Sequence, residues 1–136
     1  MRILALDVGE QRIGVAASDP SGTIAQAVGV ILRRSWPAVL DRIREYLITY
    51  QVDRIVVGLP LRLDGSEGEA AAGARAFAAR VQAAVTVPVE LQDERLSTAE
   101  AERMMVASDV RRAARRQRRD AVAAALFLQT YLDRRR

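Results

Sequence analysis

Short apolar runs separated by polar, glycine-containing connections mark the first quarter of the chain. Residues 3–6 are continuously apolar, which is typical of a strand buried on both faces. Residues 12–18 and 23–32 have the composition of two further strands, and Asp19-Pro20-Ser21-Gly22 between them has turn chemistry. Because short connections favour antiparallel neighbours, we predict a three-stranded meander.

Helices and strands alternate over the middle of the chain. Ser35 is placed to cap a helix whose apolar residues recur every three or four positions up to Tyr50. Residues 54–58 predict a strand, and the loop 59–68 separates it from an alanine-rich helix. Residues 85–91 predict the last strand.

The C-terminal third predicts two more helices. Residues 97–100, Ser-Thr-Ala-Glu, match a capping box, so a helix is expected to begin there. Residues 108–118 are polar and basic and suggest a mobile loop, whereas residues 120–133 are apolar nearly all round and predict a largely buried helix. The order βββαβαβαα implies one α/β domain over 1–136, with a mixed five-stranded sheet flanked by helices.

Composition narrows the chemistry that this domain can perform. Half of the 136 residues are hydrophobic, which suits one packed core. No apolar run reaches the roughly 18 residues that span a bilayer, and no secretory signal is visible, so we expect a cytoplasmic protein without membrane contact. Cysteine and histidine are both absent, which excludes thiolate nucleophiles and histidine-dependent triads. Acid–base chemistry is left to carboxylates, to metal-bound water or to tyrosine.

Charge is distributed unevenly along the chain. All 21 basic residues are arginine, and the net charge is +4. Residues 1–102 carry 11 arginines against 14 acids, whereas residues 103–136 carry 10 against 3. A surface this asymmetric favours a polyanionic partner, and arginine binds phosphate bidentately. The alternative is a solvated charged helix.

Three acids lie at the ends of predicted core elements. Asp7 ends the first apolar run, Glu94 follows the last predicted strand, and Asp120 opens the final helix. Ligands bind at strand ends in α/β sheets, so these acids could form a site for a hard cation, Mg²⁺ or Mn²⁺. Two of them also have a structural alternative: Asp7 as a hydrogen-bonded group at a strand end, and Asp120 as a favourable first-turn acid.

Two loops offer contacts to phosphate. Gly9 allows a close backbone approach or a positive φ angle directly after Asp7. Ser66, with the N-terminus of the helix that follows, could meet a phosphate. An ordinary strand–helix loop explains Ser66 equally well.

Four sequence blocks together resemble the YqgF family, also called RuvX, of the RNase H-like superfamily. They are Asp-x-Gly-x-x-Arg-x-Gly-Val-Ala-x-Ser-Asp at 7–19, Gly-Leu-Pro with Asp-Gly-Ser-Glu-Gly at 58–68, Asp-Glu-Arg-Leu-Ser-Thr at 93–98, and the closing block at 120–132. The resemblance covers essentially the whole chain. In one respect these blocks differ from retroviral-type members of the superfamily, which carry an acid where this chain has Gly58.

The resemblance implies an RNase H-like fold and a metal-dependent nuclease. Asp7, Glu94 and Asp120 would be the catalytic acids and would hold one or two Mg²⁺ or Mn²⁺ ions, with Asp7 the best candidate to bridge two. The implied substrate is the 5′ end of precursor 16S rRNA, with ribosomal particles as a further partner. The alternative substrate is branched DNA. The arginines expected to grip the phosphate backbone are Arg12, Arg95, Arg111, Arg112, Arg115, Arg116, Arg118 and Arg119.

Other functions stay open at the level of sequence. A non-catalytic RNA- or ribosome-binding module would keep the basic segment and would need no metal. An actin- or sugar-kinase-like ATPase also begins with Asp-x-Gly, but such enzymes close two domains on a nucleotide. A junction resolvase requires paired active sites and hence a homodimer, whereas an RNA-trimming enzyme can act as a monomer.

Overall fold

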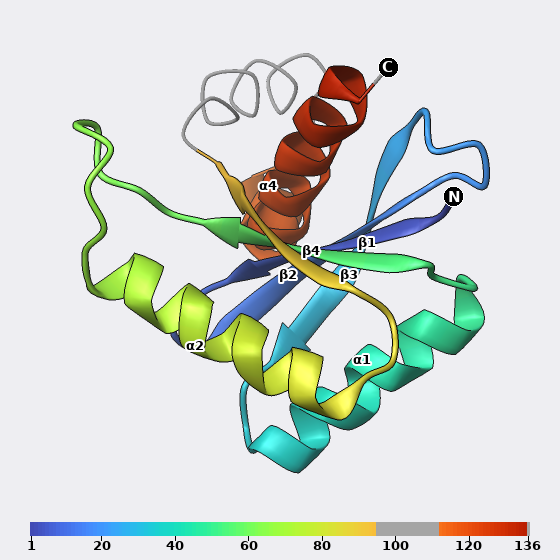
Figure 1. Cartoon of the computed structure of the whole chain (residues 1–136), viewed down its shortest axis with the longest axis horizontal. Helices are drawn as coiled ribbons and strands as arrows, with labels where there is room; N and C mark the ends of the chain where they lie inside the picture. Colours follow the sequence, from blue (N-terminus) through green and yellow to red (C-terminus); the bar gives the residue numbers. More distant parts are fainter. Residues whose placement is uncertain (95–111, 136) are drawn as a thin grey trace.

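The computed structural model describes residues 1–94 and 112–135 as a mixed sheet covered by helices on both faces (Figure 1). The strands are β1 (Ile3–Val8), β2 (Arg12–Ser18), β3 (Ala25–Leu32), β4 (Arg54–Leu59) and β5 (Val89–Asp93). The helices are α1 (Trp36–Thr49), α2 (Glu69–Ala84) and α4 (Arg112–Arg134). None of the helices in these described ranges is long and apolar enough to cross a membrane.

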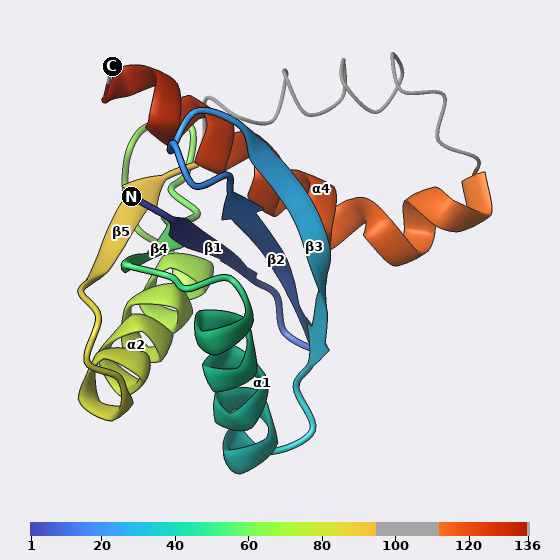
Figure 2. The ribbon, with the colours of Figure 1, turned by 90° about the vertical axis from the view of Figure 1, so that its right-hand side faces the viewer.

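The five strands lie in the order β3-β2-β1-β4-β5, so β1 is the central strand. β1, β2 and β3 pair antiparallel, and β4 and β5 add to β1 in parallel. The predicted mixed sheet, a meander followed by parallel strands, is therefore confirmed. Helices α1 and α2 cover one face of this sheet, and α4 crosses the other (Figure 2).

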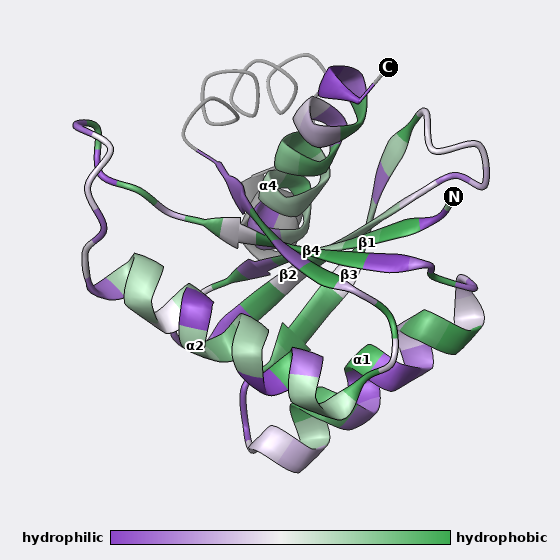
Figure 3. Cartoon of the chain, viewed as in Figure 1, coloured by the Kyte–Doolittle hydropathy of each residue, from purple (hydrophilic) through white to green (hydrophobic). Residues whose placement is uncertain are grey.

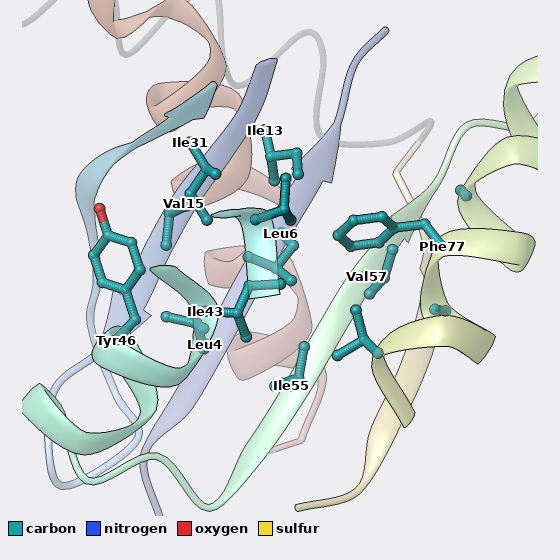
Figure 4. Packing of buried hydrophobic residues seen from close by; sticks show 14 of the residues in the cluster. Leu4, Leu6, Ile13, Val15, Ile31, Ile43, Tyr46, Ile55, Val57 and Phe77 are labelled. Atoms are coloured by element: carbon teal, nitrogen blue, oxygen red, sulfur yellow. The ribbon is translucent and has the colours of Figure 1, made fainter. Parts of the chain in front are cut away.

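Alternation along β1 divides the core between the two faces. Leu4 and Leu6 pack with α1 and α2, whereas Ile3 and Ala5 pack with α4. All four side chains are buried, which is why this strand is continuously apolar in the sequence. Figure 3 shows the strands mostly in the hydrophobic colour, whereas polar and hydrophobic colours alternate along the helices. Figure 4 shows the larger cluster, between the sheet and the two helices α1 and α2.

Two strands begin later than predicted because side chains hold the preceding backbone. Asp19 accepts hydrogen bonds from the amides of Thr23 and Ile24, so these residues belong to the turn before β3. Gln82 of α2 bonds the Val87 carbonyl and the Val89 amide, and β5 starts only there. The capping of α1 by Ser35, which accepts a hydrogen bond from the Ala38 amide, is confirmed.

The predicted start of the last helix is wrong. Helix α4 begins at Arg112, so most of the segment 108–118 that we expected to be a loop is helical. The reason is that arginine, alanine and glutamine are strong helix formers, whatever their polarity. Asp120 accordingly lies more than two turns inside the helix, and its role as a first-turn acid is excluded. The expected burial of α4 from Ala121 onward is confirmed, while the helix predicted from Ser97 lies outside the described residues.

Candidate functional site

Asp7 lies near the C-terminal end of the central strand, on the face covered by α4. It pairs with Gly14 of β2, and it alternates in the same direction as Ile3 and Ala5, which contact α4. The structure extends β1 to Val8, so Asp7 is part of the strand and its backbone is fixed by pairing. The sheet therefore holds this carboxylate rigidly beneath the helix.

Glu94 follows β5 directly and reaches back across β4 towards Asp7. Its amide donates to the Leu59 carbonyl at 3.4 Å, which continues the β4–β5 pairing past the last strand residue. Its carboxyl group lies over Gly58 and forms a hydrogen bond with Asp7. Two acids that are 87 positions apart in the sequence are thus in contact, as the sequence predicted for strand ends.

Asp120 approaches the same region from α4. Its backbone carbonyl lies against Gly14, where a side chain would leave no room. Its carboxylate forms an ion pair with Arg12, with 3.2 Å between Arg12 Nε and Asp120 Oδ2. Its negative charge acts on Asp7 strongly enough to raise the pKa of that group. The structure therefore brings the three predicted acids to one end of the sheet.

The far end of α4 is anchored by two polar side chains. Gln129 accepts from the Ala25 amide and donates to the Thr23 carbonyl, both at 2.9 Å, so it binds the beginning of β3. The Tyr131 hydroxyl donates to Glu90 of β5 at 2.8 Å and accepts from Arg54 of β4 at 3.2 Å. These contacts fix the helix across the sheet, and with it the position of Asp120.

Burial makes the acid pair reluctant to ionise. Loss of solvent raises the pKa of Asp7 to about 6, and the nearby Asp120 contributes to the rise. Burial and the charge of Asp7 raise the pKa of Glu94 to about 8, and the Asp93 charge adds to this. The neutral carboxyl group of Glu94 then donates a hydrogen bond to the Asp7 carboxylate. Such a pair lacks positive charge, and a cation between the two carboxylates would supply it.

The donor chemistry suits a hard divalent cation. Carboxylate oxygens are the ligands that Mg²⁺ and Mn²⁺ prefer, and the chain has no softer donor from cysteine or histidine. Within residues 1–94 and 112–135, however, no three acidic side chains are grouped closely enough to hold one ion together. The fit consequently rests on Asp7 and Glu94, with Asp120 nearby in its ion pair with Arg12.

The other residues singled out in the sequence have varied positions. The Gly9 amide donates to the Arg12 carbonyl at 2.8 Å and closes the β1–β2 turn, with its φ angle in the ordinary region. The Ser66 hydroxyl donates to Asp64 at 2.6 Å within the 59–68 loop. Ser66 is therefore engaged in shaping its own loop, and its contact with phosphate stays a prediction.

The predicted phosphate-binding arginines fall into four groups. Arg12 is about half exposed, at 54% of its side chain, beside Asp120. Arg119 is exposed and immediately precedes Asp120. Four more of the predicted arginines belong to the first two turns of α4: Arg112, Arg115, Arg116 and Arg118. Arg95 and Arg111 lie outside the described residues.

Sequence reasoning missed the part that two glycines play in this site. Gly14 gives the α4 backbone access to the sheet, and Gly58 makes room for the Glu94 carboxylate. A signal was present, because glycine inside an otherwise apolar strand often marks a close approach of another group. Arg33 was also missed: it donates to the Gly9 carbonyl at 2.8 Å and lies over the Phe77 ring.

Comparison with known proteins shows the family to which this chain belongs. Residues 1–134 match a family model described as RuvX, Holliday junction resolvase. A relative from Pelotomaculum thermopropionicum is 49% identical over 98% of this chain and 87% of its own length. One from Moorella thermoacetica is 48% identical over 98% of this chain and 96% of its own length. Both relatives are named as candidate pre-16S rRNA nucleases.

Solved structures share the fold at low sequence identity. RuvC of T. thermophilus, solved in complex with a Holliday junction substrate, superposes with a TM-score of 0.60 at 18% identity, covering 99% of this chain and 95% of its own. The fowlpox virus Holliday junction resolvase superposes with a TM-score of 0.60 at 14% identity, covering 98% of this chain and 99% of its own. The RNase H-like architecture expected from the sequence is confirmed.

Proposed function

Because this chain belongs to the RuvX family, whose model matches residues 1–134, we propose that it is a metal-dependent nuclease acting at the Asp7–Glu94 pair. The observation that carries this proposal is the contact between two partly buried carboxyl groups: Asp7 at the end of the central strand, and Glu94, which reaches it over Gly58. Two acids in contact and largely shielded from solvent destabilise a fold unless a cation or a shared proton compensates. A pair of acids that destabilises the fold in this way is typical of a functional site.

Asp7 and Glu94 would hold Mg²⁺ or Mn²⁺, and Asp120 would face the same site from its ion pair with Arg12. An ion bound there would supply an activated water and stabilise the leaving oxygen of a phosphodiester. Asp7 provides a fixed donor, since its backbone pairs with Gly14 of β2 and the preceding Leu6 pairs with Val57 of β4. Glu94 releases its proton when it becomes a ligand, and Arg12 orients Asp120 through their ion pair.

Arginine side chains would bind the substrate backbone near these acids. The exposed half of Arg12 keeps N–H donors available for a phosphate while Nε pairs with Asp120. Arg119, with the other arginines in the first two turns of α4, would add positive charge for binding the substrate. Contacts of this kind give affinity and register but no sequence choice. With only 4% aromatic residues, base stacking contributes little, so the shape of the substrate would decide selectivity.

The substrate that we propose is precursor 16S rRNA, cleaved at its 5′ end, free or within a ribosomal particle. The relatives at 48–49% identity carry names that refer to this RNA. This substrate would place the enzyme in the cytoplasm. Branched DNA is the second candidate, because the family model is described as a Holliday junction resolvase. Resolution of a junction would require two active sites and hence a homodimer.

The experiment that tests the function compares two substrates in one assay. A labelled RNA spanning the 5′ end of precursor 16S rRNA and a four-way DNA junction are incubated with Mn²⁺, Mg²⁺ or EDTA. We expect metal-dependent cutting of the RNA. Cutting of the junction alone would assign the DNA activity, and light scattering would then have to show a dimer. Tight, salt-sensitive binding without any cutting would replace the nuclease by a binding module.

A further inference from the structure

The carboxyl group of Glu94 occupies the space that a side chain at position 58 would fill. Gly58 lies in β4 and pairs with Gln92 of β5, two residues before Glu94. A Cβ atom at position 58 would stand closer than 3.0 Å to Glu94 Oε2 and 3.2 Å from both Glu94 Cδ and Phe127 Cε1. Even alanine at this position would therefore collide with the carboxylate.

The backbone conformation does not call for glycine at this strand position. Among the described residues, the glycines with positive φ are Gly22 and Gly65, so Gly58 has a backbone that other residues adopt readily. A glycine inside a strand weakens it, because it has no side chain to pack and loses more entropy on folding. The benefit that offsets this cost is the space itself.

That space determines whether Glu94 reaches Asp7. Glu94 comes from the end of β5, and β4 lies between β5 and the β1 strand that carries Asp7. The glutamate side chain must therefore cross the surface of β4 to form its hydrogen bond with Asp7. It crosses over Gly58, with the Phe127 ring as the neighbouring wall.

We propose that Gly58 is a positioning residue: its missing side chain admits the Glu94 carboxylate to the site, and a carboxylate carried by residue 58 itself can take over from Glu94. This inference rests on the proposed nuclease function, since it concerns the same acid pair. That a carboxylate at position 58 can replace the one of Glu94 follows from the geometry, because the carboxyl group of aspartate is attached directly to Cβ. An aspartate at position 58 thus places its oxygens within one or two bond lengths of the place that Glu94 now fills.

Four variants test the proposal. Gly58→Ala should lower cleavage at least tenfold and weaken Mn²⁺ binding, measured by calorimetry on the nucleic-acid-free protein. Glu94→Ala should do the same. Gly58→Ala in the Glu94→Ala background should cause no further loss, because both changes remove one carboxylate. Gly58→Asp combined with Glu94→Ala should regain Mn²⁺ affinity and at least tenfold in cleavage over Glu94→Ala alone.

Gly73→Ala is the matched control. Gly73 lies in α2, and a Cβ there would meet nothing within 4 Å. This variant makes the same chemical change without crowding, and it should keep wild-type cleavage and Mn²⁺ affinity.

The outcomes separate this inference from the nuclease assignment. Wild-type cleavage and Mn²⁺ affinity in Gly58→Ala, with Glu94→Ala inactive, would overturn the role of Gly58 and leave the nuclease intact. Full activity in Glu94→Ala would instead overturn the proposed site. Should Gly58→Ala be destabilised, Gly58→Ala with Glu94→Ala should be more stable than Gly58→Ala alone, because the nearest colliding group is gone and only the Phe127 ring stays close. A double variant that is no more stable than Gly58→Ala would contradict the proposal.

Discussion

Gly14 and Asp120 are in direct backbone contact: a Cβ at position 14 would come within 3.0 Å of the Asp120 carbonyl oxygen. Gly14 is also the residue paired with Asp7 across the β1–β2 ladder. One glycine therefore sets how closely α4 approaches the strand that carries Asp7. The separation between Asp7 and Asp120 depends on how closely the helix approaches.

Gly14→Ala should consequently destabilise the protein and impair catalysis together. The added methyl group must push α4 from the sheet, and overpacking of this kind costs about 1–3 kcal/mol. Urea denaturation measures the loss of stability, and a cleavage assay measures the loss of turnover. Gly73→Ala again serves as the control and should gain about 0.4–1 kcal/mol. Wild-type stability in Gly14→Ala would show that the helix is not held at this distance.

Glu94→Gln should stabilise the metal-free protein at neutral and alkaline pH. The pKa of Glu94 is raised to about 8 in the folded protein, whereas unfolding returns it to its ordinary value near 4.5. The folded state binds the proton more tightly, so this contribution to stability is full below pH 4.5 and is lost as the pH rises to 8. At pH 8 the glutamine variant should be more stable by an amount on the order of 2–4 kcal/mol.

Melting temperatures measured across pH 4–9 in EDTA test this prediction. The wild-type curve should fall with rising pH more steeply than that of Glu94→Gln. Saturating Mn²⁺ should reverse the order at pH 8, because only the wild type keeps both carboxylate ligands. Parallel curves in EDTA would mean that Glu94 titrates normally and is not held against Asp7.

Arg12→Ala should reduce cleavage without a comparable loss of stability. The ion pair between Arg12 and Asp120 is partly exposed, with side-chain exposures of 54% and 30%, and exposed pairs contribute about 0–1 kcal/mol. Loss of the pair frees Asp120 to adopt other orientations, so turnover should fall roughly tenfold. Arg42→Ala, which breaks the exposed ion pair with Glu45 on α1, is the control and should cleave normally. Equal effects of the two substitutions would remove Arg12 from the site.

Replacing the arginines at the start of α4 should weaken binding and flatten its salt dependence. Each phosphate contact contributes about −0.7 to −0.9 to the slope of log affinity against log salt. The residues to change to glutamine are Arg112, Arg115, Arg116, Arg118 and Arg119. Filter binding of the Asp7→Asn protein at several salt concentrations gives the slope. Changing Arg42 and Arg44 of α1, on the opposite face of the sheet, is the control (Figure 2). An unchanged slope would place the nucleic acid elsewhere.

The periodic parts of the fold could be predicted from sequence, since each strand and the helix α1 depend on local patterns. The convergence of Asp7 and Glu94 was also predictable, because both follow from the rule that ligands bind at strand ends. The start of α4 could not be predicted from polarity alone. The basic segment 108–118 suggests a loop by its charge, although its arginine, alanine and glutamine residues favour helix. The parts played by Gly14 and Gly58 depend on which backbone or carboxylate approaches them, and only the packed structure shows that.

The most direct test of the central claim is cleavage of the labelled precursor RNA by wild-type protein and by Asp7→Asn, each with Mn²⁺ and with EDTA. Asp7 is the residue that contacts Glu94 and feels the charge of Asp120, so its amide variant should fold and bind RNA but leave the RNA uncut. We expect the wild type to cut the RNA with Mn²⁺ and to leave it uncut with EDTA. Equal, metal-dependent cutting by Asp7→Asn would contradict the assignment of the nuclease site to this acid pair.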